Sequence, residues 1–381
     1  MTAAPRPKLL YVATEDWFFC SHFLPMARAA RDAGYEVVVA CRVRQHGEAI
    51  SREGFRLAPV EAERRERGPA GVWRYVQLLA ALMRREKPAI VHLVAMQPVI
   101  LGGIAARLAG VRRRVCAITG LGPVGGSPSP KWRAARAAIR LLLRGPVGGR
   151  GAIVVFENAD DPPLLGLDPR DPDQVAVVNG AGIDPAAYPA ALLPPAPPLR
   201  LAMVARMLWT KGVDVAVEAV RIAREHGADV ELSLYGAPDP SNATTIDEAT
   251  LRAWSARPGI AWHGPTRDVA GVWRDHHAAV LPSHGEGMPR MLIEAACCGR
   301  ALLATDVSGC RSLVRDGQNG FLFPLGDAAA LAEQIVQLAA DPALLARLGA
   351  AARATVLNGY TEADVSAAML AVYHRLLGRD P

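Results

Sequence analysis

Lysine, Cys-x-x-Cys spacing and the apolar core of a signal peptide are scarce or missing in this sequence. Only four of its 43 basic residues are lysines, namely Lys8, Lys87, Lys131 and Lys211. Its six cysteines show no Cys-x-x-Cys spacing, which argues against a zinc site or a redox motif. The first residues lead into a strand pattern without the apolar core of a signal peptide. We therefore expect a reducing, cytoplasmic setting.

Long apolar runs are also scarce, since only residues 89–106 approach the length of a membrane span without a formal charge. Gln97 and Pro98 divide this run into a β-rich half and a helical half. We interpret it as a buried parallel strand that leads into a helix, with His92 as a core histidine of that strand.

What is present is a well-packed, basic composition. The 381 residues are 51% hydrophobic and 21% charged, and a chain of this length usually forms two domains. A net charge of +6 and a pI near 9.2 favour anionic partners, such as nucleotides or phospholipid surfaces. Nucleic acid is not expected as a partner, because the arginines are scattered and no recognition motif accompanies them.

Short apolar runs alternate with amphipathic stretches, which predicts an α/β fold with parallel sheets covered on both faces. The expected strands are residues 8–13, 36–41, 55–60, 89–95, 114–119, 152–157, 175–179, 200–205, 231–235, 260–263, 278–281, 301–304 and 321–323. Prolines predict a stiff linker at 191–199 between domains at 1–190 and 200–358. One apolar helix face is predicted within 359–381.

Two carboxylates, Glu286 and Glu294, follow a short strand of the second domain. Glu286 lies in a Gly-flanked loop, and Glu294 lies about two turns into the helix that Pro289 opens as its first residue. A strand, a Gly-rich loop and a helix place backbone N–H groups and a positive dipole end together, which suits a diphosphate. A carboxylate deeper on the helix can then accept hydrogen bonds from sugar hydroxyls.

A cationic element, Arg206-Met-Leu-Trp-Thr-Lys211-Gly212, follows the first strand of the same domain. Ligands of parallel α/β sheets gather beyond the carboxyl ends of the strands. Arg206, through its guanidinium fork, and Lys211, as a point charge, could both reach a diphosphate there. A lysine retained in a chain that otherwise uses arginine supports this interpretation.

These stretches closely resemble the nucleotide-binding signature of the family 4 glycosyltransferases, retaining enzymes of the GT-B type. The matched positions are Pro282-Ser283, Glu286-Gly287-Met288-Pro289, Glu294-Ala295, Gly299, Thr305-Asp306, Gly309 and Asp316-Gly317-Gln318-Asn319-Gly320. The resemblance implies two facing Rossmann-like domains with a central cleft, and a C-terminal helix that crosses back to the first domain. His284, Gly285 and Thr119 depart from the residues that many relatives carry, which leaves the donor sugar open.

The resemblance also implies roles for single residues. Arg206 and Lys211 would neutralise the departing nucleoside diphosphate, so that neither a metal nor another cofactor is expected. Tyr235 and His263, which close neighbouring strands, would cradle the nucleobase.

Further roles concern the loop and helix that carry the two carboxylates. Glu294 would hold the ribose hydroxyls. Glu286, with the amides of Gly287 and Met288 ahead of Pro289, would bind the hydroxyls of the donor sugar.

The first half resembles the members that assemble bacterial surface polysaccharides on lipid-linked precursors. This resemblance covers residues 17–25, 87–98, 103–111 and 117–122. The implied acceptor is therefore a lipid-linked or oligosaccharide glycan. His22, in the loop after the first strand, is a candidate for orienting the acceptor or relaying a proton, and its alternative role is to cap the following helix.

A basic amphipathic helix is expected in the first domain. Its basic side chains share one face and are Arg133, Arg136, Arg140 and Arg144. Such a helix, with Trp132 at its start, could lie on the inner face of the cytoplasmic membrane through residues 132–144. The alternative is a solvated basic face.

Competing motifs are weaker. Asp171-Pro-Asp173 has the letters of a metal-binding motif but lies in a Pro-rich turn. The run Gly120-Leu-Gly-Pro-Val-Gly125 fits the dinucleotide fingerprint, yet it contains a proline and lacks an acidic partner, so an NAD oxidoreductase is not expected.

The expected function is transfer of a hexose or N-acetylhexosamine from a UDP-sugar to a lipid-linked glycan. Two alternatives stay open. One is a mannosyltransferase that uses a GDP-mannose-type donor, and the other is a non-catalytic nucleotide- or glycan-binding protein of the same fold.

Overall fold

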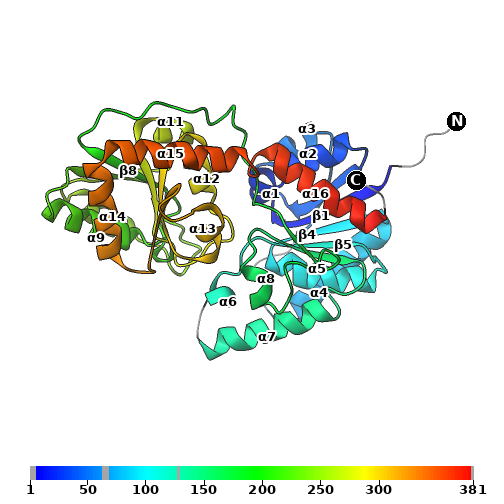
Figure 1. Cartoon of the computed structure of the whole chain (residues 1–381). Coiled ribbons are helices and arrows are strands. Elements are labelled where there is room, and N and C mark those ends of the chain that lie inside the picture. The colour runs from blue at the N-terminus through cyan, green and yellow to red at the C-terminus, as the bar shows by residue number, and fades with distance from the viewer. Residues whose placement is uncertain (1–5, 62–67, 127–128, 379–381) are drawn as a thin grey trace. The chain divides into compact units, whose positions relative to one another are not determined.

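The computed structural model describes residues 6–61, 68–126 and 129–378. Part of the N-terminal stretch, in which the sequence shows no apolar core of a signal peptide, therefore lies outside the described residues. By its internal contacts the chain divides into two units, Met1–Gly182 with Glu362–Pro381, and Ile183–Thr361. Each unit is built on a parallel sheet (Figure 1).

The first unit contains a sheet of seven parallel strands in the order β3-β2-β1-β4-β5-β6-β7. These strands are β1 (Lys8–Glu15), β2 (Glu36–Arg42), β3 (Arg56–Pro59), β4 (Ile90–Val94), β5 (Arg114–Ile118), β6 (Ala152–Phe156) and β7 (Val175–Val177). Its helices are α1 (Asp16–His22), α2 (Leu24–Asp32), α3 (Gly47–Arg52), α4 (Pro69–Glu86), α5 (Met96–Leu108), α6 (Pro123–Gly126), α7 (Pro130–Arg144), α8 (Asp161–Leu164) and α16 (Glu362–Leu377).

Alternate residues of β1 supply two separate cores on the two faces of this sheet. Leu10 and Val12 pack in a cluster with α4 and α5, whereas Leu9 and Tyr11 pack with α2 and α16. Successive strand residues point to opposite faces, which explains this division. Figure 1 shows α2 and α16 on one side of the sheet and α4 and α5 on the other. The strands are therefore buried on both faces, as their apolar runs indicate.

A buried polar chain ties α16 to this sheet. The hydroxyl of Tyr373 lies 2.7 Å from the hydroxyl of Tyr11 and 2.7 Å from Nδ1 of His92. Burial lowers the pKa of His92 to about 3, so the ring is neutral. His92 is thus the core histidine that the sequence predicted, although its Nε2 has no hydrogen-bond partner among the described residues.

The second unit contains a sheet of six parallel strands in the order β10-β9-β8-β11-β12-β13. These strands are β8 (Leu199–Val204), β9 (Val230–Tyr235), β10 (Ile260–Gly264), β11 (Ala278–Leu281), β12 (Ala301–Thr305) and β13 (Gly320–Phe323). Its helices are η1 (Trp209–Lys211), α9 (Val213–Glu225), α10 (Glu248–Ser255), α11 (Val269–Asp275), α12 (Arg290–Cys297), α13 (Ser308–Leu313), α14 (Ala328–Ala340) and α15 (Pro342–Leu357).

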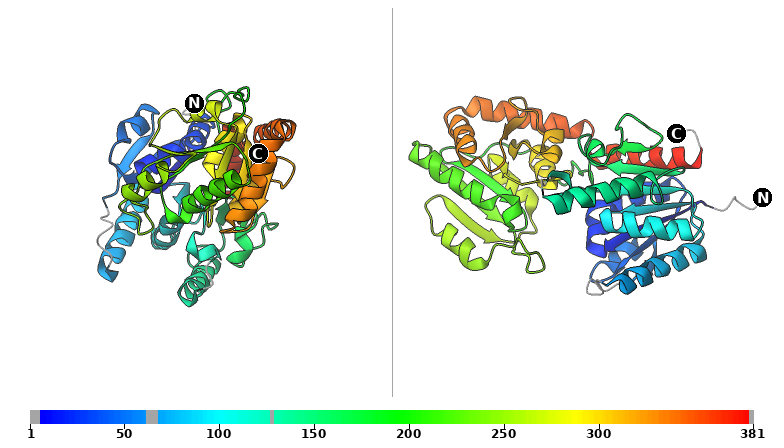
Figure 2. Two further views of the ribbon diagram at one scale, coloured as in Figure 1. Left: turned by 90° about the vertical axis from the view of Figure 1, so that its left-hand side faces the viewer. Right: turned by 90° about the horizontal axis from the view of Figure 1, so that it is seen from below.

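The order of these strands reverses between β8 and β11, which makes this point the topological switch of the second sheet. At such a point the connections leave neighbouring strands in opposite directions, and ligands bind outside the carboxyl ends of the strands. The further views in Figure 2 show helices on both sides of each sheet.

The α/β fold with two parallel Rossmann-like sheets is confirmed, and every expected strand is present. The boundary between the units differs from the predicted one, because residues 191–199 lie within the second unit. Arg300 donates hydrogen bonds to the carbonyls of Ala191 and Leu192 in this segment. His277 contacts the carbonyl of Pro194 at 3.0 Å. The Pro-rich segment is therefore fastened to the second unit rather than suspended as a linker.

The uncharged run at residues 89–106 forms β4 and most of α5, as predicted. Among the described residues no single helix is long and apolar enough to cross a membrane. Helices α14 and α15 taken together have the length and composition of a membrane span, but they are bent by 107° relative to each other.

Candidate functional site

Two loops at the switch point of the second sheet form the centre of the site. Residues 205–212 follow β8, residues 282–289 follow β11, and these two strands pair directly. The amide of His284 donates to the carbonyl of Thr210 at 2.9 Å, and the hydroxyl of Ser283 donates to the same carbonyl at 3.2 Å. One carbonyl oxygen therefore joins the two loops.

Gly212 allows the loops to approach this closely. Its φ of 69° lies in the left-handed region, where residues with a side chain are strained. A Cβ atom at this position would lie 2.0 Å from the carbonyl oxygen of Pro282. Any other residue would have to push the loops apart, so the glycine is required for the contact.

Lys211 and Glu286 meet across the joined loops. Nζ of Lys211 lies 2.5 Å from Oε1 of Glu286, and the two side chains are 23% and 11% exposed. Because both groups are largely withdrawn from water, their attraction is screened less than that of a surface pair. Two residues that the sequence identified separately are thus in direct contact at the carboxyl edge of the sheet.

Gly309 on α13 packs against the loop that carries Glu286. A Cβ atom on Gly309 would lie 2.5 Å from the carbonyl oxygen of Glu286 and 2.4 Å from that of Gly287. The sequence matched Gly309 to a motif without assigning it a function. The structure supplies one, because only glycine lets the two backbones approach this closely.

The helix that carries Glu294 begins later than predicted. Pro289 is the N-cap of α12 and not its first helical residue, and no side chain caps the first turn. Since α12 begins at Arg290, Glu294 lies just over one turn inside the helix and not about two.

Arg206 has a different carboxylate partner from Lys211. Its Nη1 donates to Oδ2 of Asp239 at 2.8 Å, and 59% of its side chain is exposed. Hydrogen bonds from Ser241 and from Arg206 lower the pKa of Asp239, which keeps this carboxylate charged. Arg206 and Asp239 line a cavity of about 420 Å³ at the carboxyl ends of β8, β9 and β10. Asp239 could not be identified from the sequence, because it lies in a Pro-rich loop without a motif.

Tyr235 lines the same cavity and stacks on His263. The ring centroids are 4.7 Å apart and the ring planes are inclined by 16°. The indole of Trp262 donates to the carbonyl of Gly236 at 2.9 Å and thereby ties the ends of β9 and β10 together. A flat aromatic surface at these strand ends suits a planar ring such as a nucleobase. The expected placement at the strand ends is confirmed, and the binding role stays a prediction.

Glu294 is buried and holds two partners that the sequence did not suggest. Only 6% of the residue is exposed. Nε of Arg290 donates to Oε1 of Glu294 at 2.8 Å, and the hydroxyl of Tyr188 donates to the same oxygen at 3.1 Å. Burial raises the pKa of Glu294, while Arg290 and Tyr188 oppose this rise. Tyr188 could not be found from spacing, because 106 residues separate it from Glu294.

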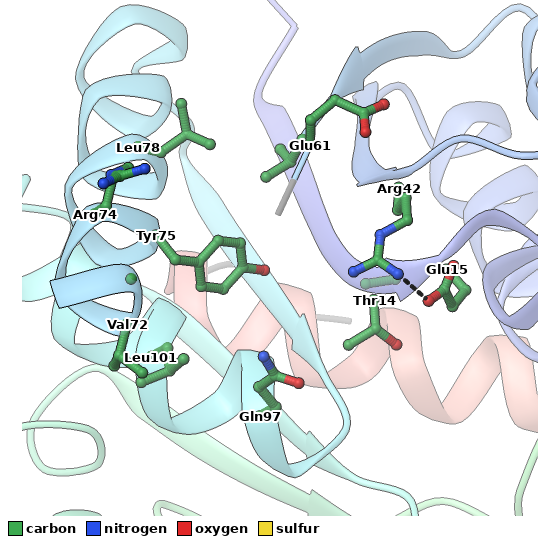
Figure 3. A pocket seen from close by; sticks show the side chains of 13 residues that line it. Thr14, Glu15, Arg42, Glu61, Val72, Arg74, Tyr75, Leu78, Gln97 and Leu101 are labelled. Atoms are coloured by element: carbon green, nitrogen blue, oxygen red, sulfur yellow. Dashed lines mark hydrogen bonds and ion pairs between the residues drawn. The ribbon is translucent and has the colours of Figure 1, made fainter. Parts of the chain in front are cut away.

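The first unit has a cavity of its own, of about 200 Å³, lined from the carboxyl ends of β1 and β2 and from α4 and α5 (Figure 3). On one side Arg42 donates to Glu15 at 3.0 Å. Figure 3 shows the ring of Tyr75 facing this ion pair, with Leu78 on the same helix and Gln97 from α5 nearby. The cavity therefore combines polar and apolar walls, as a sugar with polar edges and apolar faces requires.

His22 ends α1 in the first unit. Its Nδ1 lies 2.6 Å from the hydroxyl of Ser21, and its ring lies 4.4 Å from that of Phe18. The N-cap position of the next helix is occupied by Phe23 and not by His22. Its role toward an acceptor stays a prediction.

Three of the four arginines on α7 anchor the helix to neighbouring segments. Arg136 donates to the carbonyl of Val124 at 2.8 Å, and Arg140 donates to that of Leu164 at 2.8 Å and 3.0 Å. Arg144 donates more weakly to Gly166, at 3.4 Å. The basic face is therefore partly occupied within the protein.

The Asp171-Pro-Asp173 motif is accounted for by local structure. The side chain of Asp171 accepts hydrogen bonds from the amide of Asp173 at 3.0 Å and from Gln174 at 2.6 Å, so it forms a turn. Across the part of the chain that the structure describes, no group of three or more His, Cys, Asp or Glu side chains is placed to hold a metal ion.

Solved structures with this architecture define the class of the fold. A sucrose-phosphate synthase from Thermosynechococcus elongatus has a TM-score of 0.79 at 18% identity, and the match covers 98% of this chain and 100% of that one. Anabaena HepE in complex with UDP and glucose has a TM-score of 0.75 at 15% identity, with coverage of 97% and 99%. The fold is therefore GT-B, as the sequence implied.

Two family models match the chain and identify its family. The model described as "Glycosyl transferase 4-like" matches residues 8–146, and the one described as "Glycosyl transferases group 1" matches residues 198–341. The chain belongs to the group 1, family 4-like glycosyltransferases.

Curated relatives match part of the chain. The α-maltose-1-phosphate synthase of Mycolicibacterium smegmatis is 31% identical over 59% of this chain and 62% of its own length. The capsular polysaccharide biosynthesis glycosyltransferase CapM of Staphylococcus aureus is 26% identical over 46% of this chain and 45% of its own. The chain thus spans about half the length of the curated relatives that it matches.

Proposed function

We propose that this protein is a retaining glycosyltransferase that moves a hexosyl or N-acetylhexosaminyl group from a UDP-sugar to a hydroxyl of a lipid-linked glycan. The observation that carries this proposal is the contact of Lys211 with Glu286 at 2.5 Å, at the switch point of the second sheet. A cation next to a carboxylate there can hold a diphosphate beside the hydroxyls of a sugar.

In the proposed mechanism the acceptor hydroxyl attacks the anomeric carbon from the face that the diphosphate leaves. The bond between that carbon and the diphosphate oxygen breaks as the bond to the acceptor oxygen forms. A diphosphate oxygen takes the proton of the hydroxyl. Arg206 and Lys211 stabilise the charge that grows on the leaving group. His22, on the first unit, is proposed to orient the acceptor.

The donor is bound by groups of the second unit in this proposal. Glu286 accepts hydrogen bonds from the sugar hydroxyls, and the amides of Gly287 and Met288 donate hydrogen bonds to the sugar. Glu294 accepts hydrogen bonds from the ribose, and the stacked pair of Tyr235 and His263 holds the base.

UDP is preferred as the nucleotide because a structural neighbour, HepE, is described in complex with UDP and glucose. The glycan acceptor is supported by CapM, whose name places it in capsular polysaccharide biosynthesis. The cavity beside Tyr75 in the first unit would receive part of the acceptor.

A thermal-shift panel of UDP, GDP, ADP and their sugars tests the donor site. A ligand at 100 times its dissociation constant stabilises a protein by about 2.7 kcal/mol. We expect UDP and a UDP-sugar to raise the melting temperature. A response to GDP alone would favour the mannosyltransferase alternative. Binding without transfer to any lipid-linked acceptor would favour a non-catalytic protein, and no response to any nucleotide would contradict the donor site.

We further propose that the reaction needs no metal or other cofactor, because Arg206 and Lys211 supply the positive charge that Mg²⁺ provides elsewhere. Turnover should be unchanged after treatment with EDTA. A loss of turnover that added Mg²⁺ restores would contradict this part of the proposal.

The proposed place of action is the inner face of the cytoplasmic membrane, with peripheral contact through residues 132–144. The cation of Lys131 lies 5.2 Å from the ring of Trp132, and both belong to the first turn of α7. An aromatic ring and basic groups at one helix end suit an anionic lipid interface.

A further inference from the structure

We propose that Tyr188 is a positioning residue for Glu294, whose carboxylate it holds in the orientation that receives the ribose hydroxyls. The inference rests on the proposed function, since it takes a nucleotide ribose as the ligand of Glu294. It adds a residue that lies outside every motif of the donor site, on the segment with which the second unit begins.

The side chains of Tyr188, Arg290 and Glu294 contact one another. The hydroxyl of Tyr188 donates to Oε1 of Glu294 at 3.1 Å, and Nε of Arg290 donates to the same oxygen at 2.8 Å. Arg290 also interacts with the hydroxyl of Tyr188. Both of these hydrogen bonds end on the same carboxylate oxygen. Two donors from different parts of the chain thereby restrict the rotation of the carboxylate.

The backbone of Tyr188 is itself anchored, so its hydroxyl has a defined place. Arg353 on α15 donates to the carbonyl of Tyr188 at 3.4 Å and also to the carbonyl of Cys297 at the end of α12. The amide of Ala191 donates to the carbonyl of Cys298 at 3.4 Å. The segment around Tyr188 is therefore bound to the same helix that carries Glu294.

The charges that face Glu294 come from these neighbours. Arg290, one turn earlier on α12, is the cation beside it, and the thiol of Cys298 lies close enough to interact with it electrostatically. Burial favours the neutral carboxylic acid, whereas the hydrogen bonds from Arg290 and Tyr188 favour the carboxylate. Loss of the Tyr188 hydroxyl should therefore release the rotation of Glu294 and also move its protonation to higher pH.

The two effects weaken the ribose contact in a recognisable way. A protonated or rotated carboxyl group no longer accepts two charge-assisted hydrogen bonds from neighbouring hydroxyls. Nucleotides that lack a ribose hydroxyl form fewer hydrogen bonds with Glu294, so a substitution of Tyr188 should change their binding less. If Tyr188 merely supported the fold, its substitution would instead weaken the binding of all nucleotides equally.

The experiment compares full-length wild type, Tyr188→Phe and Glu294→Gln by calorimetry. The ligands are UDP, 2′-deoxy-UDP and 3′-deoxy-UDP, between pH 5.5 and pH 8.5. Tyr360→Phe is the matched control, because Tyr360 is a buried tyrosine of the same unit whose hydroxyl donates to the carbonyl of Ser312 at 2.6 Å. If the panel identifies GDP as the ligand, the corresponding deoxy-GDP compounds replace the uridine nucleotides.

Wild type and Tyr360→Phe should prefer UDP over at least one deoxy nucleotide, and Glu294→Gln should lose this preference. Tyr188→Phe should reduce the preference about tenfold, the order expected when a hydrogen bond to a charged group is removed. The reduction should be larger at pH 5.5 than at pH 8.5.

Three results would overturn the inference. In the first, Tyr188→Phe weakens the binding of UDP and of the deoxy nucleotides by the same factor at every pH, which would mean that Tyr188 only supports the fold. In the second, its binding matches wild type throughout. In the third, wild type binds UDP without any preference for the ribose hydroxyls. Failure of the proposed function is a separate outcome, recognised when wild type binds no nucleotide at all.

Discussion

At the scale of single residues, Arg206 and Lys211 carry the most direct prediction. Changing either to alanine should reduce turnover about 10²–10³-fold, with a smaller loss of donor affinity, because charge on the diphosphate grows as the glycosidic bond breaks. Steady-state kinetics with a UDP-sugar, together with calorimetry, separates turnover from binding. Arg221→Ala is the control, since Arg221 lies on α9 and pairs with Glu218 and Glu225. Turnover close to wild type in either site variant contradicts the assignment.

The two carboxylates of the site should have separable roles. Glu294→Ala should reduce the affinity for the free nucleotide as much as that for the sugar nucleotide, since a ribose contact is common to both. Glu286→Ala should reduce the affinity for the sugar nucleotide and leave the affinity for the free nucleotide unchanged, because Lys211, the partner of Glu286, remains to bind phosphate. Calorimetry with UDP and a UDP-sugar measures all four affinities. The roles are reversed if the pattern is reversed.

Single residues were predictable where short sequence spacing places them in one loop. Arg206 and Lys211 lie in the segment that follows β8, Glu286 lies in the loop that follows β11, and these two paired strands end at the same sheet edge. Tyr188 and Asp239 were not predictable in this way. Their importance depends on the segments that fold against Glu294 and Arg206, and such long-range contacts leave no trace in local spacing.

At the scale of elements, Gly309 tests how α13 supports the donor loop. Gly309→Ala should displace the Glu286 loop, because the new Cβ atom would meet two backbone carbonyls at 2.4 and 2.5 Å. We expect a large loss of sugar-nucleotide binding together with a lower melting temperature. Gly285→Ala is the control in the same loop, since a Cβ atom there meets nothing within 4 Å. Equal binding by both variants would show that the loop adapts without loss.

A second prediction at this scale concerns α7. Changing Arg136 and Arg140 together to glutamine should lower stability, because the side chains hold the carbonyls of Val124 and Leu164. Changing Lys131 and Arg133 to glutamine should leave stability close to wild type and reduce sedimentation with anionic vesicles, as each basic group near such a surface contributes about 1 kcal/mol. Denaturation and vesicle sedimentation measure the two effects. The proposed membrane contact is contradicted if the variant binds vesicles as well as wild type, or if wild type does not bind them at low salt.

Elements were predictable because both faces of each sheet are covered. Strands buried on both sides appear as continuous apolar runs, and β4 and β11 are examples. The arginines of α7 show what such patterns miss. A basic helix face has the same sequence whether its side chains meet water, lipid or the carbonyls of a neighbouring loop.

At the scale of the whole molecule, the division of the chain departs from the sequence. Prolines marked residues 191–199 as the linker, yet the second unit begins at Ile183. Composition identifies a stiff segment but not the surface to which Arg300 and His277 bind it. The first unit, in turn, is discontinuous and includes α16 from the end of the chain.

Tyr373 provides a test of that discontinuous unit. In Tyr373→Phe the buried Tyr11 hydroxyl and Nδ1 of His92 lose the partner that lies 2.7 Å from each. Each buried polar group left unpaired costs about 1–3 kcal/mol, so unfolding in urea should begin at clearly lower concentration than in wild type. Tyr360→Phe, which removes a single hydrogen bond in the second unit, should cost about 1 kcal/mol.

The same variant separates the stability of one unit from the binding site of the other. The donor site proposed here is built entirely from residues of Ile183–Thr361, so the affinity of Tyr373→Phe for UDP should equal that of wild type under conditions where the chain is folded. Calorimetry at low temperature, far from the unfolding transition, measures this. A loss of UDP affinity in Tyr373→Phe would show that the docking of α16 on its sheet controls the nucleotide site, and the two units would then have to be treated as one functional body.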